Sequence, residues 1–273
     1  MLPAPKLLGG PYVVGILNIT PDSFSDGGEH MTAATPRALA MLEAGADIVD
    51  IGGESTRPGA APVCEEEEIA RVVPAVSALR AASNAPISID TMKPAVARAA
   101  FAAGATMWND VAALRAPGAL DTAAALGAPV VLMHMQGEPR SMQDAPQYAD
   151  VVAEVIEFLQ ERVTMATRRG VERIIVDPGI GFGKTLDHNL ALLRAVPRLR
   201  AELGRPVLIG ASRKRFIQAL DVGASDARRG RLGGSLAAAL MAAEGGAEFV
   251  RVHDVAETVQ ALKVWRAAAA VSI

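Results

Sequence analysis

The sequence predicts a single (β/α)8 barrel, one domain that spans residues 1–273. Eight short apolar or β-branched runs alternate with longer alanine- and leucine-rich segments. Several of these segments end in Gly-Ala just before the next run, as helix C-caps do, and no linker or low-complexity stretch divides the chain. Eight strand–helix units in about 250 residues are typical of such a barrel. An open, doubly wound sheet with one added segment is the structural alternative.

Each predicted strand is a short β-branched or apolar run. In chain order the runs are YVVGILNIT (12–20), ADIVDIGG (46–53), PISIDT (86–91), TMWNDV (106–111), PVVLMHM (129–135), RIIVDPG (173–179), PVLIGAS (206–212) and EFVRVHD (248–254). The helical stretches between them include TPRALAMLEAGA, KPAVARAAFAAGA and SLAAALMAAEGGA. The acidic residues 65–68 are predicted to form the solvated first turn of a helix, where the helix dipole favours negative charge.

Composition narrows the class of protein. With 273 residues and 51% hydrophobic residues, the chain can bury a substantial core, and it contains no apolar run long enough to cross a membrane. The start MLPAPKLLGG lacks a signal-peptide pattern, so we expect a cytoplasmic protein. Cys64 is the only cysteine, which excludes an internal disulfide and a cysteine-based metal cluster. A net charge of −3 provides no polybasic surface for nucleic acid.

Polar residues accumulate where the predicted strands end, which is where such barrels place their chemistry. They are Asn18, Asp50, Asp90, Asn109, Asp110, Asp177, Ser212 to Arg215, Arg251 and His253. Arg251 and His253 share one face of the last strand. Together with SRKR after the seventh strand, they lie where these barrels commonly hold phosphate. The sequence therefore predicts a site that binds an anion on one side and is rich in carboxylates on the other.

The glycine-rich segment DPGIGFGKT and three of the histidines do not predict a nucleotide site or a metal site. DPGIGFGKT is not a nucleotide P-loop, because Pro178 stands where that motif needs glycine, and its glycine spacing does not fit a dinucleotide fingerprint. The glycines instead allow backbone to approach a flat ligand under Phe182. The histidines His30, His134 and His188 show no metal-ligand spacing.

Seven motifs, in order and at successive strand ends, resemble those of the dihydropteroate synthase family. They are NITPDSFSDGG, DIGGESTRPG, SIDT, ND, DPGIGFGK, GASRK and RVHDV, and they span about residues 12–265. The resemblance implies condensation of 6-hydroxymethyl-7,8-dihydropterin pyrophosphate with 4-aminobenzoate, with Mg²⁺ as cofactor. It also implies inhibition by sulfonamides and a homodimer formed through helices near the C-terminus.

The family's functional residues carry over onto matching positions of this chain. The implied pterin-binding residues are Asp90, Asn109, Met133, Asp177, Phe182, Lys214 and Arg251. The implied diphosphate contacts are Thr56, Arg57, Arg251 and His253, and Asn18 matches the position that meets Mg²⁺. The implied 4-aminobenzoate contacts are Phe24, Pro58 and Arg215. Asp26, Arg57, Lys214 and Arg251 are the implied catalytic residues.

The implied reaction is a dissociative substitution that needs no enzyme nucleophile. The cation left on the pterin methylene must be protected from water, so TPDSFSDGG and GGESTRPG are interpreted as two closing loops. One position departs from the family pattern, because Arg215 stands where many relatives have serine. A pterin-dependent corrinoid methyltransferase and a non-catalytic pterin-binding paralogue are the alternative functions.

Overall fold

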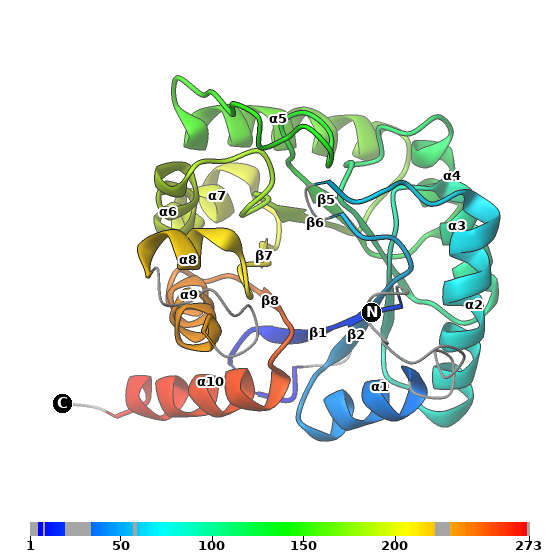
Figure 1. Cartoon of the computed structure of the whole chain (residues 1–273), viewed down its shortest axis with the longest axis horizontal. Helices are drawn as coiled ribbons and strands as arrows, with labels where there is room; N and C mark the ends of the chain where they lie inside the picture. The colour runs from blue at the N-terminus through cyan, green and yellow to red at the C-terminus, as the bar shows by residue number, and fades with distance from the viewer. Residues whose placement is uncertain (1–4, 8, 20–33, 57–58, 222–229, 272–273) are drawn as a thin grey trace.

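The chain folds into a (β/α)8 barrel in the computed structural model, which describes residues 5–7, 9–19, 34–56, 59–221 and 230–271. The strands surround a common axis and the helices form a ring outside them (Figure 1). The predicted fold class is therefore confirmed, and the open doubly wound alternative is wrong.

The eight strands of the described residues form one parallel sheet in the order β6-β5-β4-β3-β2-β1-β8-β7. A parallel bridge between Val176 and Val207 joins the two ends of this order and closes the ring. The strands are β1 (Tyr12–Asn18), β2 (Ile48–Gly52), β3 (Ile87–Asp90), β4 (Met107–Asp110), β5 (Val130–Met133), β6 (Ile174–Asp177), β7 (Leu208–Ile209) and β8 (Phe249–Val252). Each lies inside its predicted run.

The outer ring contains one helix after most strands and two after β6 and after β7. The helices are α1 (Ala34–Glu43), α2 (Glu65–Ala82), α3 (Pro94–Ala102), α4 (Ala119–Leu126), α5 (Val151–Arg168), α6 (Leu186–Arg194), α7 (Val196–Leu203), α8 (Arg215–Leu220), α9 (Leu232–Glu244) and α10 (Val255–Ala269). Several helix ends follow simple capping rules, as two examples show. The Asp150 side chain accepts hydrogen bonds from two backbone N–H groups at the start of α5, and Gly127 ends α4 in the left-handed conformation.

Alternation along the strands separates the barrel interior from the layer beneath the helices. One set of side chains forms an apolar floor inside the barrel: Tyr12, Val14, Ile48, Met107, Val131, Ile175, Leu208 and Phe249. The rings of Tyr12 and Phe249 stack there, with centroids 4.8 Å apart. Because this floor fills most of the N-terminal part of the interior, the charged groups lie in the C-terminal part, although the buried Ser88 stands in register with Met107 of the floor.

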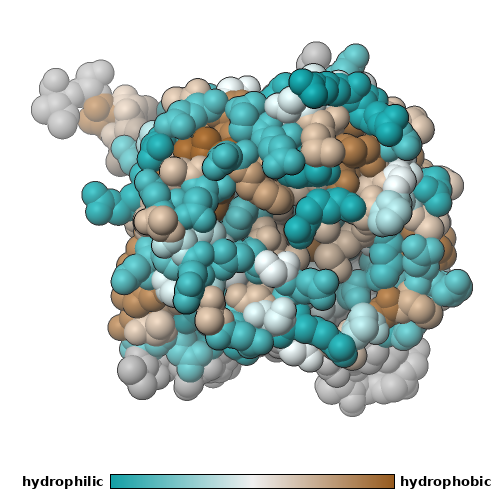
Figure 2. Space-filling model, turned by 90° about the horizontal axis from the view of Figure 1, so that it is seen from above, coloured by the Kyte–Doolittle hydropathy of each residue, from teal (hydrophilic) through white to brown (hydrophobic). Residues whose placement is uncertain are grey.

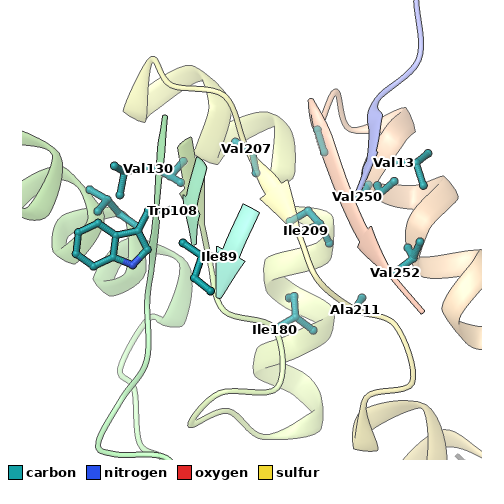
Figure 3. Close-up of a cluster of buried hydrophobic side chains, with 14 of the residues drawn as sticks. Val13, Ile89, Trp108, Val130, Ile180, Val207, Ile209, Ala211, Val250 and Val252 are labelled. Atoms are coloured by element: carbon teal, nitrogen blue, oxygen red, sulfur yellow. The ribbon is translucent and has the colours of Figure 1, made fainter. Parts of the chain in front are cut away.

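The other set of strand side chains packs against the helices and forms the main hydrophobic core. Figure 3 shows part of it, including Val13, Ile89, Trp108, Val130 and Val250. Trp108 is fully buried, and its Nε1 donates a hydrogen bond to the backbone oxygen of Thr91 at 2.8 Å. This bond ties β4 to the segment that follows β3, at the end of the barrel where the polar residues gather.

The outer surface is mixed. Figure 2 shows one side of the molecule, where hydrophilic residues cover much of the surface and smaller apolar patches lie among them. None of the helices in the described part of the chain is long and apolar enough to cross a membrane.

Replacing Trp108 by phenylalanine tests how strongly this core contact stabilises the barrel. The change removes the donor to Thr91 and leaves a gap beside the helices, so we expect the free energy of unfolding to fall by about 1–3 kcal/mol. Chemical denaturation measures it. Trp265 is the matched control, because its ring is only half-buried and its Nε1 donates to Glu244 in an exposed hydrogen bond, so the same change should cost under about 1 kcal/mol. Equal losses in the two variants would contradict this account.

Candidate active site

The candidate active site begins with a polar layer above the apolar floor of the barrel. Asn109, Asp177 and Arg251 each stand two residues after a floor residue, so they share its inward direction. The register places Asn18 beside Gly52, Gly52 beside Asp90 and Asp90 beside Asn109. Four adjacent strands therefore contribute one level of the interior, with two amides and a carboxylate on it.

Arg251 links this layer into one charged cluster. Its Nε lies 2.6 Å from Asp50 Oδ2, and its Nη2 lies 2.6 Å from Asp90 Oδ2. Asn109 Nδ2 donates a hydrogen bond to the same Asp50 oxygen at 3.0 Å. Asp50 therefore holds both the guanidinium and the Asn109 amide. One N–H of the Asn109 amide is used by Asp50, and the carbonyl oxygen of the same amide can act only as an acceptor.

Burial perturbs the acids of this cluster. It raises the pKa of Asp90 to about 7, although the Arg251 guanidinium opposes the shift. Burial likewise raises the pKa of Asp177 to about 6, against a hydrogen bond from the Gly179 N–H and the nearby Lys214 charge. The pKa of Arg251 is raised, because Asp50 and Asp90 more than offset its burial. Buried carboxyl groups whose pKa values are raised toward neutral are typical of functional sites.

A glycine-containing loop after β6 supplies the apolar side of the site. Phe182 packs with Met133 and its buried neighbours Val111 and Met135. Lys214 Nζ lies 3.9 Å above the centre of the Phe182 ring, within cation–π distance. Gly181 has φ +81°, and a Cβ there would lie 2.9 Å from Lys214 Cδ, so this position needs glycine for the lysine to lie across the loop.

The predicted anion side comes from the ends of β7 and β8. Ser212 Oγ lies 3.1 Å from His253 Nδ1 and also accepts from the His253 backbone N–H at 3.2 Å, which fixes the imidazole. Arg213 in the SRKR sequence is committed elsewhere, because its guanidinium pairs with Asp254. Arg215 begins α8 and is exposed, and Thr56 is half-buried in the segment after β2.

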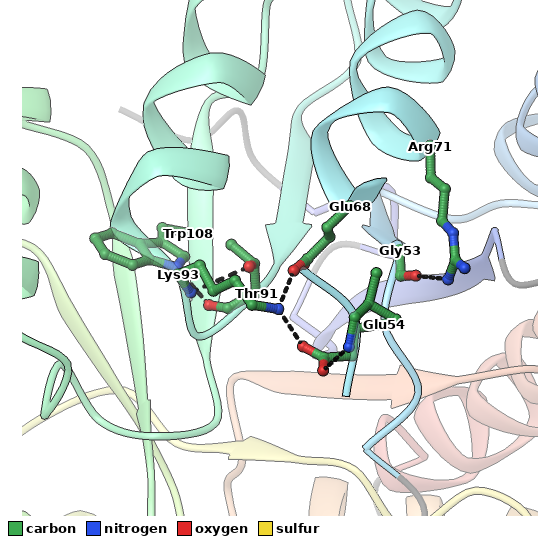
Figure 4. Close-up of polar contacts among 8 residues, drawn as sticks. Gly53, Glu54, Glu68, Arg71, Thr91, Lys93 and Trp108 are labelled. Atoms are coloured by element: carbon green, nitrogen blue, oxygen red, sulfur yellow. Dashed lines mark hydrogen bonds and ion pairs between the residues drawn. The ribbon is translucent and has the colours of Figure 1, made fainter. Parts of the chain in front are cut away.

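A second network anchors the segment between β2 and α2, which carries Thr56 (Figure 4). Lys93 Nζ lies 2.6 Å from Glu54 Oε2 and 2.6 Å from Glu68 Oε2. Glu54 Oε1 accepts a hydrogen bond from the backbone N–H of Val63, and Arg71 donates to the backbone oxygen of Gly53. The start of the segment is therefore tied to Lys93 of the next strand–helix unit, and its two ends are tied to each other through Glu54.

This network corrects one prediction. Residues 65–68 do form the first turn of α2, and Glu65, Glu66 and Glu67 are exposed. The Glu68 side chain is fully buried, because Lys93 from the next unit covers it. A run of like charges therefore does not all face solvent when one turn of the helix points at a neighbouring cation.

Asp110 also differs from its prediction as a rim residue. It follows Asn109 and so points to the opposite face of β4, away from the barrel interior. Its two oxygens accept hydrogen bonds from the backbone N–H groups of Ala112 and Leu114 at 2.8 Å each. Asp110 therefore shapes the turn after β4. The predicted residues Phe24, Asp26, Arg57 and Pro58 lie outside the described residues.

The structure adds two features to which the sequence assigned no function. Asp50 was noted only as a polar residue of the second strand, yet it holds two predicted pterin contacts. Lys184 and His134 form a buried pair beneath the Phe182 loop, with Lys184 Nζ 3.0 Å from His134 Nδ1. The period of two along β2 could have indicated that Asp50 points inward with Gly52. No local pattern relates Lys184 to His134, which are 50 residues apart.

A groove of about 660 Å³ between α5 and α7 lies away from this site. Its lining includes Thr164, Met165, Arg198 and Glu202, and the last two form an exposed ion pair with each other. It contains none of the acids with pKa values near neutral, so we place the chemistry at the strand ends instead.

The fold and the site define a (β/α)8 barrel with a cluster of charged and amide side chains at the C-terminal ends of its strands, where proteins of this fold bind their ligands. Comparisons with known proteins agree. The family of pterin binding enzymes matches residues 14–253. The dihydropteroate synthase of Escherichia coli strain K12 is 50% identical over 262 residues, covering 94% of this chain and 91% of that protein.

Solved structures give the same result. Xanthomonas albilineans dihydropteroate synthase with 4-aminobenzoic acid is 55% identical, with a TM-score of 0.90 over 96% of this chain and 94% of that one. Yersinia pestis dihydropteroate synthase in a sulfonamide drug complex is 44% identical, with a TM-score of 0.91 over 99% of this chain and 100% of that one. The chain therefore belongs to the dihydropteroate synthase family of pterin binding enzymes, which are transferases of folate biosynthesis.

The raised pKa of Asp90 predicts a pH dependence of stability. Its ordinary value is 3.8 and its folded value is about 7, so in this range the folded protein holds a proton that the unfolded chain releases. The resulting stabilisation is complete below about pH 4 and is lost as the pH rises through 7. Asp90→Asn cannot titrate. Its free energy of unfolding, relative to the unmodified protein, should therefore increase by about 2–3 kcal/mol between pH 5 and pH 8.

Denaturation at the two pH values measures this difference. Asp187→Asn, at an exposed position in the first turn of α6, is the matched control and should show no such change. A pH-independent difference for Asp90→Asn would contradict the burial of this carboxyl group.

Proposed function

We propose that this chain condenses 6-hydroxymethyl-7,8-dihydropterin pyrophosphate with 4-aminobenzoate, forming 7,8-dihydropteroate and releasing pyrophosphate. The observation that carries the proposal is the interior layer, in which Arg251 pairs with both Asp90 and Asp50 and Asn109 donates to Asp50. A dihydropterin presents a donor-rich edge and a carbonyl oxygen. It therefore requires acceptors side by side and a cation within reach.

The pterin would lie between the polar layer and the apolar wall. Asp90, Asn109 and Asp177 would accept hydrogen bonds from its ring nitrogens and amino group. Lys214 would donate to it, and Met133 with Phe182 would contact a ring face. Support comes from the inward direction of these strand residues and from Lys214 lying over Phe182. Arg251 would stack on the ring and also reach the diphosphate.

The reaction breaks the bond between the pterin methylene carbon and the diphosphate oxygen, and the electron pair leaves with the diphosphate. The positive charge left on the methylene is spread over the dihydropterin ring. The amine nitrogen of 4-aminobenzoate then forms the new carbon–nitrogen bond and loses a proton. The chain's task is to hold the leaving group and exclude water. Arg251, His253, Thr56 and Arg57 are the residues proposed to hold it.

Asn18 is the residue proposed to meet Mg²⁺. Asn18 Oδ1 lies 3.6 Å from the point where a Cβ on Gly52 would stand, so this oxygen faces a position that carries no side chain. An amide oxygen suits Mg²⁺, which binds few protein ligands and prefers phosphate oxygens and water for the rest. When bound, Mg²⁺ would neutralise part of the charge on the leaving diphosphate. Phe24, Pro58 and Arg215 are proposed for 4-aminobenzoate, with Asp26 near its amine.

The experiment that tests the function measures pyrophosphate release by the purified protein with the pterin substrate and Mg²⁺. Release that depends on 4-aminobenzoate is expected. Release without 4-aminobenzoate, or none at all, would contradict the proposal. Methyl transfer to a corrinoid, or pterin binding without turnover, would instead support one of the two alternative functions.

Asp177→Asn tests the pterin contact. The substitution replaces a charged acceptor by an amide that can present the wrong group, and a charge-assisted hydrogen bond is worth roughly 1.5–3 kcal/mol. We expect pterin affinity to fall by about 10- to 100-fold, measured by calorimetry with 6-hydroxymethylpterin. Asp187→Asn is the exposed control and should bind normally. Affinity in Asp177→Asn within a factor of three of the unmodified protein would argue against this placement.

His253→Ala tests the diphosphate contact. Loss of the imidazole should weaken binding of the pterin pyrophosphate by about 10-fold and leave the unphosphorylated hydroxymethyl pterin nearly unaffected, since a hydrogen bond to a charged group is lost only with the first ligand. Paired titrations with the two ligands measure this. His188→Ala, in the capping box of α6, is the matched histidine control. Equal losses for both ligands would remove His253 from the anion site.

Sulfonamides should compete with 4-aminobenzoate and not with the pterin substrate, because they carry the same arylamine with a sulfonyl group in place of the carboxylate. Raising 4-aminobenzoate should raise the concentration needed for half-inhibition, whereas raising the pterin substrate should not. Initial-rate measurements at varied concentrations of each substrate decide this. If sulfonamides competed with the pterin substrate instead, the proposed 4-aminobenzoate subsite would be wrong.

A further inference from the structure

The buried pair of Lys184 and His134 lies directly beneath the proposed pterin site. Lys184 is 3% exposed and His134 is 6% exposed. Lys184 Nζ lies 2.9 Å from the backbone oxygen of Phe182, 3.0 Å from His134 Nδ1 and 3.4 Å from the backbone oxygen of His134. Burial lowers the pKa of Lys184 to about 7, against the opposing charge of Asp177. In its protonated form the head group has three donors, and here three acceptors surround it.

These contacts join the loop after β5 to the loop after β6. The two backbones approach closely at Gly179, which has φ +71° and where a Cβ would lie 1.9 Å from the His134 backbone oxygen. Only glycine permits this approach. Lys184 donates to one carbonyl from each loop, so its head group sets how the loops sit against each other. Tyr148 adds a separate link, from its hydroxyl to the backbone oxygen of Gly183.

The imidazole is fixed as an acceptor. Its ring packs edge to face on Phe158, with centroids 4.9 Å apart at 86°, and is tilted against Tyr148. Burial lowers the pKa of His134 to about 3, with the charge of Lys184 acting in the same direction, so the ring is neutral. Its Nδ1 therefore presents a lone pair to Lys184.

We propose that Lys184, oriented by His134, is a positioning residue for the pterin site. It holds the Phe182 backbone, and the Phe182 ring in turn lies beneath the Lys214 ammonium at 3.9 Å. The loop after β6 also starts at Asp177, whose backbone oxygen accepts from the His134 N–H at 2.9 Å. Lys184 thereby sets the spacing between the carboxylate and the cation that would read the pterin. The assignment rests on the function proposed above.

Lys184→Met tests the assignment, because it keeps the length of the side chain and removes the donors. We expect the affinity for 6-hydroxymethylpterin to fall at least 10-fold and KM for the pterin pyrophosphate to rise. KM for 4-aminobenzoate should stay within a factor of three. The matched control is Tyr148→Phe, which removes a different hydrogen bond to the same loop and should leave pterin affinity within a factor of three.

A double-mutant cycle separates positioning from general loosening of the fold. Lys214→Met should weaken pterin binding strongly in the unmodified protein and much less once Lys184 is already methionine, because the Lys214 head group is then misplaced. If the two losses multiply independently, the assignment is overturned. It is also overturned if Lys184→Met binds pterin within a factor of three of the unmodified protein.

If Lys184→Met does not fold, His134→Phe decides. It keeps the ring packing on Phe158 but removes the Nδ1 acceptor, and a 3- to 10-fold loss of pterin affinity is expected with circular dichroism unchanged. Unchanged affinity would overturn the assignment. Asp177→Asn serves as the reference for the site itself. Normal pterin binding in that variant would contradict the proposed function, whereas loss in Asp177→Asn alone would contradict only the role of Lys184.

Discussion

The polar interior of this barrel depends on Arg251 lying between Asp50 and Asp90. Two carboxylates and an asparagine amide meet within a few ångströms, above a floor of tightly packed apolar side chains. Without the guanidinium, nothing would offset the burial of these two neighbouring carboxyl groups, whose charged forms repel each other. Removing one partner of a buried ion pair costs about 3–5 kcal/mol, since it leaves the other charge uncompensated. The cluster is therefore stable only when Arg251, Asp50 and Asp90 are all present.

A cluster of this kind is a poor way to stabilise a fold, because desolvation offsets most of the attraction between the charges. Apolar side chains fill the lower interior of the same barrel with no such cost. The charged layer is better explained by ligand binding. Its groups are already desolvated and oriented before the ligand arrives, so little reorganisation remains when a polar heterocycle enters.

The loops, like the charged layer, are held in place before a ligand binds. Lys93 links the segment after β2 to α2, and Lys184 links the loops after β5 and β6, each using one buried or half-buried cation to satisfy several oxygens. Gly179 and Gly181 allow the backbone and the Lys214 side chain to approach where any other residue would collide. These links lie behind the proposed ligand contacts. They position the side chains that would contact the ligand, without contacting the reacting atoms themselves.

The sequence by itself determined the barrel and most of the proposed site. Strand runs, helix spacing and C-cap glycines are local patterns, so each segment of the barrel can be predicted by itself. The site residues Asn18, Asp90, Asn109, Asp177 and Arg251 could be predicted because they lie at or near the ends of these strands.

Only the tertiary structure decided which partners these groups have. Glu68 is buried because Lys93 arrives from 25 residues away, Asp50 gains its role from Arg251 at a separation of 201 residues, and Lys184 meets His134 across 50. No local periodicity encodes such pairings, since they arise only when closure of the barrel brings distant strand ends together.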